Sequence, residues 1–551
     1  MYCSTRFDEM NKVWYGPSTE YTIDKQKNFG EIILEKLSTD ANRAMQIDGI
    51  TGETLTKAEV RQRTIRCAQN LVKFGYTKND SITIVARNHH NLTPLLFGAI
   101  CCGIPISPLD VLIVEDGIST ILQRLRPAII FCDADVLRSI QDTIDGIGLS
   151  AKIFTVNKSV DGYDSIDSLM VATDKEDSFV CATIDDAVSH IALIACSSGS
   201  TGLPKSICWT HASFIHSFLP YSNTEVRTFR CLNFSSFYWF SSIWSTLSST
   251  LCSIRVFSSQ PFSTDLFFDL VEKYKVQKFL GPPCQFQAFI KSKRCKNANL
   301  STLLVCIIAG SSIPPVLLEN LTQIIPKCLL MTGYGMTEMG GISFTTPREL
   351  KECPNSAGQL LQGAQIKIIS DTGDKCGIDE HGEIYVKMPI PSMGYYNDEI
   401  ATQNAFDSEG YFITGDLGYF NAGRLFIIGR KKEIFKNRGF AVWPIELENL
   451  ILKHPAIKEA TVVCVYDDDI MTDLPAAVVI KQDGFSITEN EVSTMISDKL
   501  ANYKHLEGGV YFVDELPVTP SGKIIRPKIK DIAQNLYERK TQPGAPTSKQ
   551  L

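Results

Sequence analysis

Several patterns are absent from this chain of 551 residues, and each absence excludes a class of protein. The 17 cysteines include no Cys-x-x-Cys pair, and the adjacent Cys101 and Cys102 suit neither a mutual disulfide nor a zinc site. The eight histidines show no metal-ligand spacing. We therefore expect no disulfide framework and no histidine metal centre, but free, buried thiols in a reducing compartment.

Long apolar runs and a surplus of positive charge are also missing. The most apolar stretch, residues 95–106, is broken by Gly103 and Pro105 and is shorter than the about 20 residues that a membrane-spanning helix needs. Residues 1–12 are polar and charged, so we expect no signal peptide. The formal net charge of −7 gives no electrostatic reason to bind nucleic acid or an anionic membrane. We expect no transmembrane segment and no nucleic-acid partner.

Apolar strands alternate with helical patterns in the first part of the sequence. Thr56 and Glu59 have capping-box spacing ahead of a helical repeat of apolar residues. Residues 81–86 predict a strand, and residues 91–102 predict a helix. Further apolar strands are predicted at residues 128–132, 190–196 and 303–309. This alternation favours an α/β fold with layered parallel sheets.

The pattern changes near residue 360 and again near residue 430. Short β runs separated by Gly and Asp turns predict a small β-rich unit with strands at residues 365–370, 382–387 and 424–428. A compact α+β unit is then predicted, with helices at residues 444–452 and 489–500 and strands at residues 459–465, 476–480 and 510–513. The tail from Thr541 has the composition of a disordered segment.

A loop suited to phosphate follows the strand at residues 190–196. It reads SSGSTGLPKS, and its small residues, hydroxyls and lysine supply donors and positive charge. The candidate phosphate-binding residues are Ser197, Ser198, Gly199, Ser200, Thr201, Gly202 and Lys205. The loop differs from a Walker A motif because Pro204 replaces the second glycine and lacks its N–H. We therefore predict a phosphate loop, but not that of a P-loop NTPase.

Four further motifs follow in order: GYGMTE at residues 333–338, TGD at 414–416, GRKK at 429–432 and SGK at 521–523. Together with the phosphate loop, the set resembles the adenylate-forming superfamily of acyl-CoA synthetases, 4-coumarate–CoA ligases and beetle luciferases. The loop and the GYGMTE segment are most similar to the insect luciferase-like acyl-CoA synthetase branch. The resemblance covers roughly residues 25–530.

The resemblance implies a domain organisation and a two-step reaction. An N-terminal AMP-binding domain would span residues 1–428, with layered α/β subdomains and the β-rich unit, and a mobile α+β lid domain would span residues 429–551. A carboxylate would attack the α-phosphorus of ATP and release pyrophosphate. After the lid domain rotates, the thiol of coenzyme A would attack the acyl carbon and release AMP. ATP, Mg²⁺ and coenzyme A are thus the implied cosubstrates and ion.

The resemblance also implies roles for single residues. Lys523 would reach from the lid domain to the carboxylate and the phosphate, Thr337 would donate to the α-phosphate, and Glu338 would help hold Mg²⁺. Asp416 would accept hydrogen bonds from the ribose hydroxyls, assisted by Arg430. The adenine would lie against the residues Gly310, Ser311, Ser312, Gly333, Tyr334 and Gly335. Lys436 and Gly439 would lie on the lid face used for the thiol step.

The sequence departs from the family pattern at four positions. Gly429 replaces the hinge aspartate, Ser206 replaces the glycine after the loop lysine, and Ser311 replaces the second glycine of the adenine segment. Near Phe234, where many relatives have a histidine pair, Ser236 stands at the histidine that borders the acyl pocket. Ser236, Phe237 and Tyr238 are either an acyl-pocket wall, apolar in character, or part of an ordinary buried aromatic cluster.

These features lead to one main hypothesis with alternatives. We predict an ATP-dependent acyl-CoA synthetase, a monomer or weak oligomer, whose substrate is a small-molecule carboxylic acid, best a medium- or long-chain fatty acid. The alternatives are a luciferase-like oxygenase, an enzyme that loads a carrier-protein thiol, and a silent binder of nucleotide or acyl-AMP. The terminal Lys-Gln-Leu is not a clear peroxisomal signal, so a cytoplasmic or peroxisomal location is expected.

Overall fold

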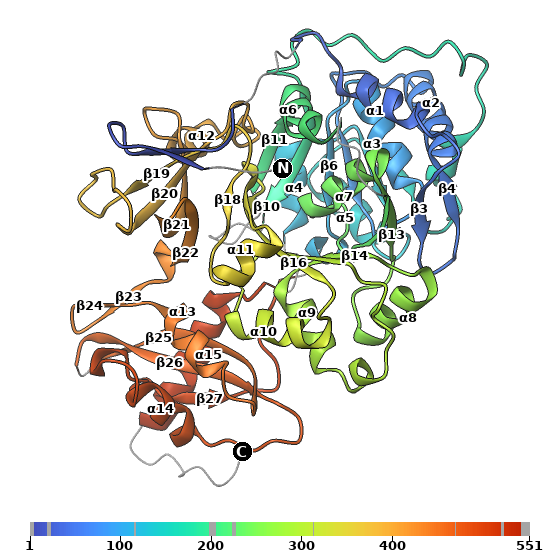
Figure 1. Cartoon of the computed structure of the whole chain (residues 1–551). Coiled ribbons are helices and arrows are strands. Elements are labelled where there is room, and N and C mark those ends of the chain that lie inside the picture. Colours follow the sequence, from blue (N-terminus) through green and yellow to red (C-terminus); the bar gives the residue numbers. More distant parts are fainter. Residues whose placement is uncertain are drawn as a thin grey trace.

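The structure is a computed structural model that describes residues 5–18, 24–114, 117–197, 205–222, 228–311, 313–468, 470–519 and 523–541. Two large sheets and their helices form one part, a β-rich unit lies beside them, and an α+β unit at the C-terminal end lies below the β-rich unit (Figure 1). This is the mixed α/β architecture that the sequence predicts. No helix among the described residues is long and apolar enough to cross a membrane.

The first large sheet has seven strands and is parallel except at one edge. Its spatial order is β11 (Lys205–Thr210), β10 (Ile191–Ser197), β6 (Ile106–Leu109), β5 (Ile82–Val85), β7 (Ile129–Cys132), β8 (Lys152–Thr155) and β9 (Asp164–Ser165). Only β11 runs antiparallel to its neighbour in this sheet. The predicted strands at residues 81–86, 128–132 and 190–196 are confirmed, as is their parallel pairing.

The second large sheet has nine strands and carries the segments predicted to contact adenine at two strand ends. Its order is β18 (Gln359–Leu360), β17 (Gly340–Phe344), β16 (Leu329–Met336), β15 (Val305–Ala309), β14 (Lys278–Gly281), β12 (Phe229–Leu232), β13 (Ser253–Phe257), β3 (Ala44–Asp48) and β4 (Thr54–Thr56). Strands β3 and β12 to β16 are parallel to their neighbours within that group. The ends of β15 and β16 therefore meet at one sheet edge, which brings residue 310 close to residue 334.

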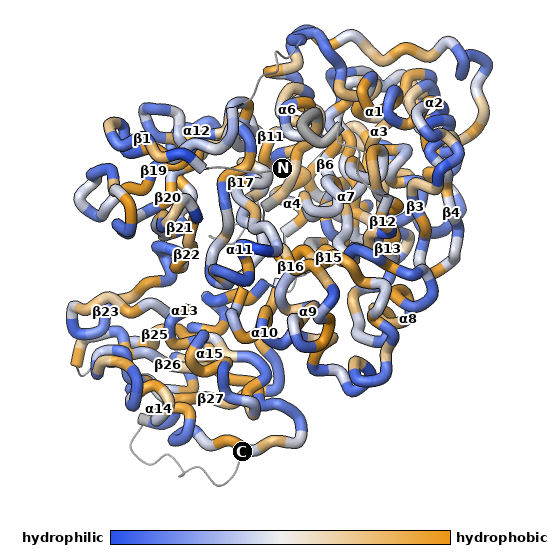
Figure 2. Tube along the Cα trace, viewed as in Figure 1, coloured by the Kyte–Doolittle hydropathy of each residue, from blue (hydrophilic) through white to orange (hydrophobic). Residues whose placement is uncertain are grey.

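Helices cover both large sheets. They include α1 (Phe29–Ser38), α2 (Lys57–Lys73), α3 (Leu92–Cys101), α4 (Ile118–Leu125), α5 (Leu137–Gly146), α6 (His211–Ser222), α7 (Phe240–Leu251), α8 (Thr264–Tyr274), α9 (Pro283–Lys291) and α10 (Pro315–Ile324). The predicted capping box is present at the start of α2, where Thr56 and Glu59 exchange hydrogen bonds. Hydrophobic stretches gather on the inner strands and hydrophilic ones at the outer turns (Figure 2). The described cysteines are free thiols, as expected.

The β-rich unit contains an element that the sequence analysis missed. Its sheet has the order β1 (Arg6–Asp8), β2 (Val13–Tyr15), β19 (Gln365–Ile369), β20 (Gly382–Lys387), β21 (Phe412–Asn421) and β22 (Arg424–Arg430). Strand β2 pairs with β19, so the beginning of the chain joins a sheet otherwise built from residues 365–430. Trp14 is buried there between the rings of Phe7 and Phe420, at 4.4 and 4.5 Å.

The C-terminal unit packs helices on both faces of a short sheet. After the hairpin β23 (Phe435–Asn437) and β24 (Phe440–Val442), it contains α13 (Pro444–Ile451), β25 (Ile457–Asp467), β26 (Thr472–Lys481), α14 (Glu489–Ser497), β27 (Val510–Phe512) and α15 (Arg526–Thr541). Alternate residues of β25 face opposite sides, because Val462 packs with α13 and α14 whereas Val463 packs with α15. All five elements predicted in this unit are present.

Candidate active site

Asp416 is the centre of a polar cluster at the edge of the β-rich unit. It lies on β21 directly opposite Arg430 of β22, and the Arg430 Nε is 3.0 Å from its Oδ1. The hydroxyl of Tyr334 donates to its Oδ2 at 2.7 Å. Burial raises the pKa of Asp416, whereas the charge of Arg430 and the hydrogen bond from Tyr334 lower it. Tyr334 and Asp416, predicted for adenine and ribose, are thus brought together from two strands although they are 82 residues apart in sequence.

Strand β16 carries the GYGM part of the predicted motif, and Thr337 and Glu338 follow directly. The backbone carbonyl of Thr337 accepts a hydrogen bond from the indole of Trp209 at 2.8 Å, which fixes the turn after β16. The carboxylate of Glu338 accepts one from the hydroxyl of Tyr395 at 3.4 Å. Burial raises the pKa of Glu338, and the nearby charges of Lys205 and Arg430 lower it. Glu338 is therefore a half-buried carboxylate close to cations.

Lys205 belongs to the predicted phosphate loop and lies close to Glu338. Its ammonium lies 4.5 Å from the centre of the Tyr395 ring, and Tyr395 is the same residue that donates to Glu338. The segment before β11, residues 198–204, lies outside the described residues, as does Ser312, so their predicted phosphate and adenine contacts stay predictions. Tyr395 was missed by the sequence analysis because no motif includes it.

Lys523 reaches this cluster from the C-terminal unit. Burial and the charge of Arg430 lower its pKa, and the carboxylates of Asp416 and Glu338 oppose that shift. Two hydrogen bonds join the residue to Thr519: its N–H donates to the Thr519 hydroxyl at 3.1 Å, and its carbonyl accepts from the N–H of Thr519 at 2.7 Å. The lysine and the two carboxylates predicted to act together thus converge from three segments of the chain.

Arg526 anchors the segment that carries Lys523. Its guanidinium makes two parallel hydrogen bonds to Glu448 of α13 at 2.7 and 2.9 Å, donates to the carbonyl of Val462 at 2.9 Å, and lies 3.1 Å from the Glu433 carboxylate. Both Arg526 and Glu448 are largely removed from solvent. This ion pair ties the segment that begins at Lys523 to the core of the C-terminal unit.

Replacing Arg526 by methionine is expected to destabilise the C-terminal unit by about 3 kcal/mol, because a buried carboxylate that loses its partner is costly. Denaturant unfolding measures the change. The matched control is Arg438→Met, which removes a more exposed two-point pair with Glu507 in the same unit and is expected to cost about 0–1 kcal/mol. Equal losses for the two variants would show that Arg526 is no anchor.

The residues predicted for the acyl pocket lie in a mixed polar and aromatic environment. Ser236 donates to the buried Asp110 at 2.9 Å. Phe237 and Tyr238 are buried, and the guanidinium of Arg255 lies 5.0 Å from the centre of the Phe237 ring. Their place in an acyl pocket stays a prediction, and both interpretations given for these residues remain open.

The residues predicted for the second step are exposed. Lys436 lies on β23, and Gly439 occupies the turn to β24 with a φ of 85°. Gly429 has a φ of 143°, which disfavours side-chain-bearing residues, so glycine suits the backbone at this point of β22. Strand β22 runs across the predicted domain boundary at residues 428/429, which stays a prediction.

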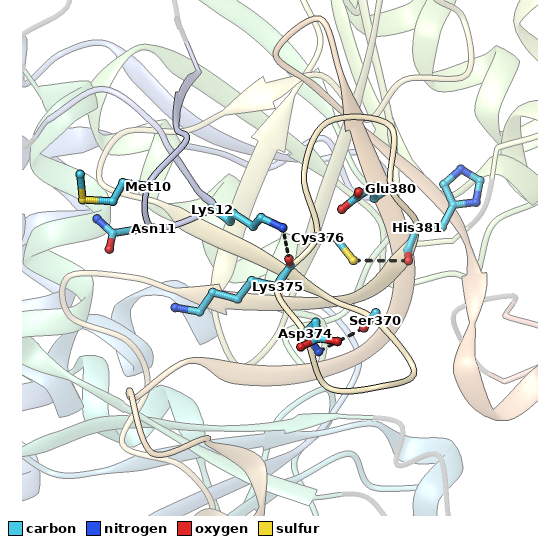
Figure 3. Close-up of a pocket in the computed structure, with 9 residues that line it drawn as sticks. All are labelled: Met10, Asn11, Lys12, Ser370, Asp374, Lys375, Cys376, Glu380 and His381. Carbon is cyan, nitrogen blue, oxygen red and sulfur yellow. Dashed lines mark hydrogen bonds between the residues drawn. The ribbon is translucent and has the colours of Figure 1, made fainter.

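A polar surface depression lies elsewhere, on the β-rich unit (Figure 3). It is lined by Met10, Asn11, Lys12, Ser370, Asp374, Lys375, Cys376, Glu380 and His381. Lys12 donates to the carbonyl of Lys375 at 2.9 Å across it. None of the predicted site residues lines it, so we do not assign it to the reaction.

Comparison with known proteins decides the family. The model of the AMP-binding enzyme family matches residues 36–396, and the model of the AMP-binding enzyme C-terminal domain matches residues 446–523. The chain belongs to the AMP-binding enzyme family. The resemblance inferred from the five motifs is thereby confirmed.

Relatives with similar sequences include proteins named as 4-coumarate–CoA ligases and proteins named as luciferin 4-monooxygenases. The chain is 30% identical over 535 residues to the probable 4-coumarate–CoA ligase 3 of Dictyostelium discoideum, covering 92% of this chain and 96% of the relative. It is 29% identical to the luciferin 4-monooxygenase of Photinus pyralis, covering 87% and 89%. An anthranilate CoA ligase structure in complex with anthranoyl-AMP matches with a TM-score of 0.83 at 20% identity, covering 94% and 99%, which shows the shared fold.

Proposed function

We propose that this AMP-binding enzyme activates a carboxylic acid as an acyl-adenylate and transfers the acyl group to the thiol of coenzyme A. The observation that carries the proposal is the convergence of Lys523 with Asp416 and Glu338 at the junction of the β-rich and C-terminal units. A cation near one buried and one half-buried carboxylate, next to a loop rich in donors, suits a reaction that brings two anions together.

In the first step, one carboxylate oxygen of the acid attacks the α-phosphorus of ATP, and pyrophosphate leaves. Lys523 is proposed to bind both the attacking carboxylate and the α-phosphate, which lowers their mutual repulsion. Thr337 donates to the same phosphate, and Lys205 with residues 197–202 holds the β- and γ-phosphates. Asp416 accepts from the ribose hydroxyls, and Tyr334, already bonded to Asp416, places its ring against the adenine.

Glu338 fits the role of a magnesium ligand. It is a half-buried carboxylate whose hydrogen bond from Tyr395 is long, at 3.4 Å, so its oxygens are available to a hard cation. One protein carboxylate and the phosphate oxygens of ATP would together supply the oxygen ligands that Mg²⁺ prefers. When bound, the ion would neutralise charge on the phosphates.

In the second step, the thiolate sulfur attacks the acyl carbon, the bond to the phosphate oxygen breaks, and AMP leaves. The C-terminal unit is proposed to rotate first, so that Lys436 and Gly439 approach the pantetheine. Rotation about Gly429 requires changes in backbone angles that glycine tolerates. The division at residues 428/429, a monomeric or weakly associated state and a cytoplasmic or peroxisomal location remain part of this proposal.

The acid is proposed to be a medium- or long-chain fatty acid. Buried aromatic side chains near Ser236 support an apolar wall, whereas the Asp110–Ser236 pair adds hydrogen-bonding capacity beside it. The names of the relatives add 4-coumarate and luciferin as candidate acids. These classes differ enough to be separated in one panel.

The test is pyrophosphate release from ATP and Mg²⁺ across a panel of fatty acids, 4-coumarate and luciferin, each with and without coenzyme A. Release that depends on the acid and rises with coenzyme A would support the proposed ligase and identify its substrate class. If coenzyme A does not change the release, adenylation would stand, but the acceptor of the acyl group would be another one, such as oxygen or a carrier-protein thiol. ATP binding without release for any acid would instead indicate a silent binder.

A further inference from the structure

Lys291, the last residue of α9, connects the part built on the nine-stranded sheet with the C-terminal unit. Its ammonium donates to the backbone carbonyls of Ile457 and Lys458 at 3.2 and 2.9 Å. Helix α9 belongs to the nine-stranded part, whereas both carbonyls stand at the beginning of β25 in the C-terminal unit, which lies beside α9 (Figure 1). One side chain thus makes two hydrogen bonds between these parts.

One of the two acceptors, the Lys458 carbonyl, is available because β25 is irregular at this point. Its pairing with β26 shifts between Ile457 and Glu459, so Lys458 has no partner in the register. Such a bulge leaves backbone groups of the extra residue unpaired within the ladder. Lys291 satisfies the Lys458 carbonyl, and an ammonium makes stronger hydrogen bonds to carbonyls than a neutral donor does.

The orientation that allows this contact is also the orientation that brings Lys523 to the active site. Lys523 belongs to the same C-terminal unit and senses the charges of Asp416 and Glu338. A rotation that carried Lys523 away from these carboxylates would also carry β25 away from α9. The hydrogen bonds of Lys291 and the placement of Lys523 near the carboxylates are therefore gained and lost together.

We propose that Lys291 is a positioning residue that holds the C-terminal unit in the orientation for adenylate formation and releases it for the thiol step. This inference rests on the proposed two-step function, because only such a reaction needs two orientations. Lys291 touches neither ATP nor the acid in this scheme, so it acts through the placement of Lys523.

The charge environment adds a pH dependence. Burial lowers the pKa of Lys291 to about 8, with Glu459 raising it and Lys458 lowering it. As the pH rises through about 8 the ammonium loses its proton, so the hydrogen bonds from Lys291 to the β25 carbonyls weaken on the alkaline side. Arginine keeps its charge there, so Lys291→Arg is expected to move the alkaline fall in adenylation to higher pH.

The experiment measures the two half-reactions separately in Lys291→Met, Lys291→Arg and the exposed control Lys296→Met. Adenylate formation is followed by acid-dependent ATP–pyrophosphate exchange without coenzyme A. The thiol step is followed by conversion of chemically prepared acyl-adenylate in the presence of coenzyme A. Lys291→Met is expected to lower exchange about tenfold, as the loss of a charged hydrogen bond would, while the thiol step stays within twofold or accelerates.

Hydrogen exchange supplies a readout that does not depend on activity. In Lys291→Met, amides of the peptide that carries Lys523 are expected to exchange faster than in the wild type, as are those around residue 457. Lys291→Arg should restore slow exchange at neutral pH, and Lys296→Met should resemble the wild type.

Two results would overturn the inference. An equal fall in both half-reactions would show that Lys291 serves general stability, and unchanged exchange rates at both peptides would show that it holds nothing in place. If the wild type proves not to use coenzyme A, the proposed function fails in its second step, while pyrophosphate exchange and hydrogen exchange still decide the role of Lys291.

Discussion

Replacing Lys523 by alanine is expected to lower the rate of acyl-adenylate formation by about 10²–10³-fold, the effect typical of removing one preorganised charge stabiliser from an active site. Lys523 is the cation that the C-terminal unit presents to Asp416 and Glu338, and its pKa is lowered by burial and by Arg430. ATP affinity should change far less, because Asp416, Tyr334 and the phosphate loop remain. Acid-dependent pyrophosphate release measures the rate, and calorimetric ATP binding measures the affinity.

Lys528→Ala is the matched control for this variant, since Lys528 is an exposed lysine five residues further along. It should leave both quantities within twofold of the wild type. Lys523→Ala should also retain the thiol step from prepared acyl-adenylate, because Lys523 is proposed to leave the site before that step. A rate of adenylation close to that of the wild type in Lys523→Ala would remove the lysine from the mechanism.

Replacing Asp416 by asparagine is expected to weaken ATP binding by about 1.5–3 kcal/mol, which corresponds to roughly tenfold to a hundredfold in Kd. The variant removes the charged acceptor that we assign to the ribose, and it also leaves Arg430 and the Tyr334 hydroxyl without their ionised partner. The KM for the acid should change little. Tyr334→Phe, which removes one donor to Asp416, is expected to have a smaller effect on Kd.

The charge of Asp416 also predicts how ATP affinity changes as the pH falls. Burial raises the pKa of Asp416 above the ordinary value of 3.8 for this side chain. As the pH falls, Asp416 therefore gains its proton earlier than an exposed aspartate would, and ATP affinity should decline with it. Asp416→Asn should lack this decline, and the exposed-carboxylate variant Asp371→Asn should retain it. The same pH profile in both variants would assign the decline to another group.

Local sequence patterns predicted most of the secondary structure, because each pattern is decided within one element. The capping box at Thr56 and the strand at residues 382–387 are examples, and both have the predicted bounds. The pairing of β2 with β19 could not be predicted in this way, since the two strands are about 350 residues apart and β2 is only three residues long. Burial of Trp14 stabilises that pairing. The sequence around a single tryptophan does not show which distant residues it will pack against.

The residues of the candidate site also differ in whether a local sequence pattern could predict them. Asp416, Glu338 and Lys523 were predictable because each belongs to a motif in which residue order is constrained by chemistry. Tyr395, Arg526 and Lys291 were not, because their roles arise from contacts with residues that lie far away in sequence: Glu338, Glu448 and the carbonyls of β25. Positioning residues of this kind can be recognised only when the fold places their partners beside them.

The central claim, formation of an acyl-adenylate, is tested most directly by following oxygen from the acid into AMP. The acid is supplied with ¹⁸O in its carboxylate, together with ATP, Mg²⁺ and coenzyme A, and the products are analysed by mass spectrometry. Attack of the carboxylate on the α-phosphorus followed by cleavage at the acyl carbon places one ¹⁸O in AMP and none in pyrophosphate. The account predicts that labelled AMP. Label in inorganic phosphate with ADP as the second product, or AMP without label, would contradict it.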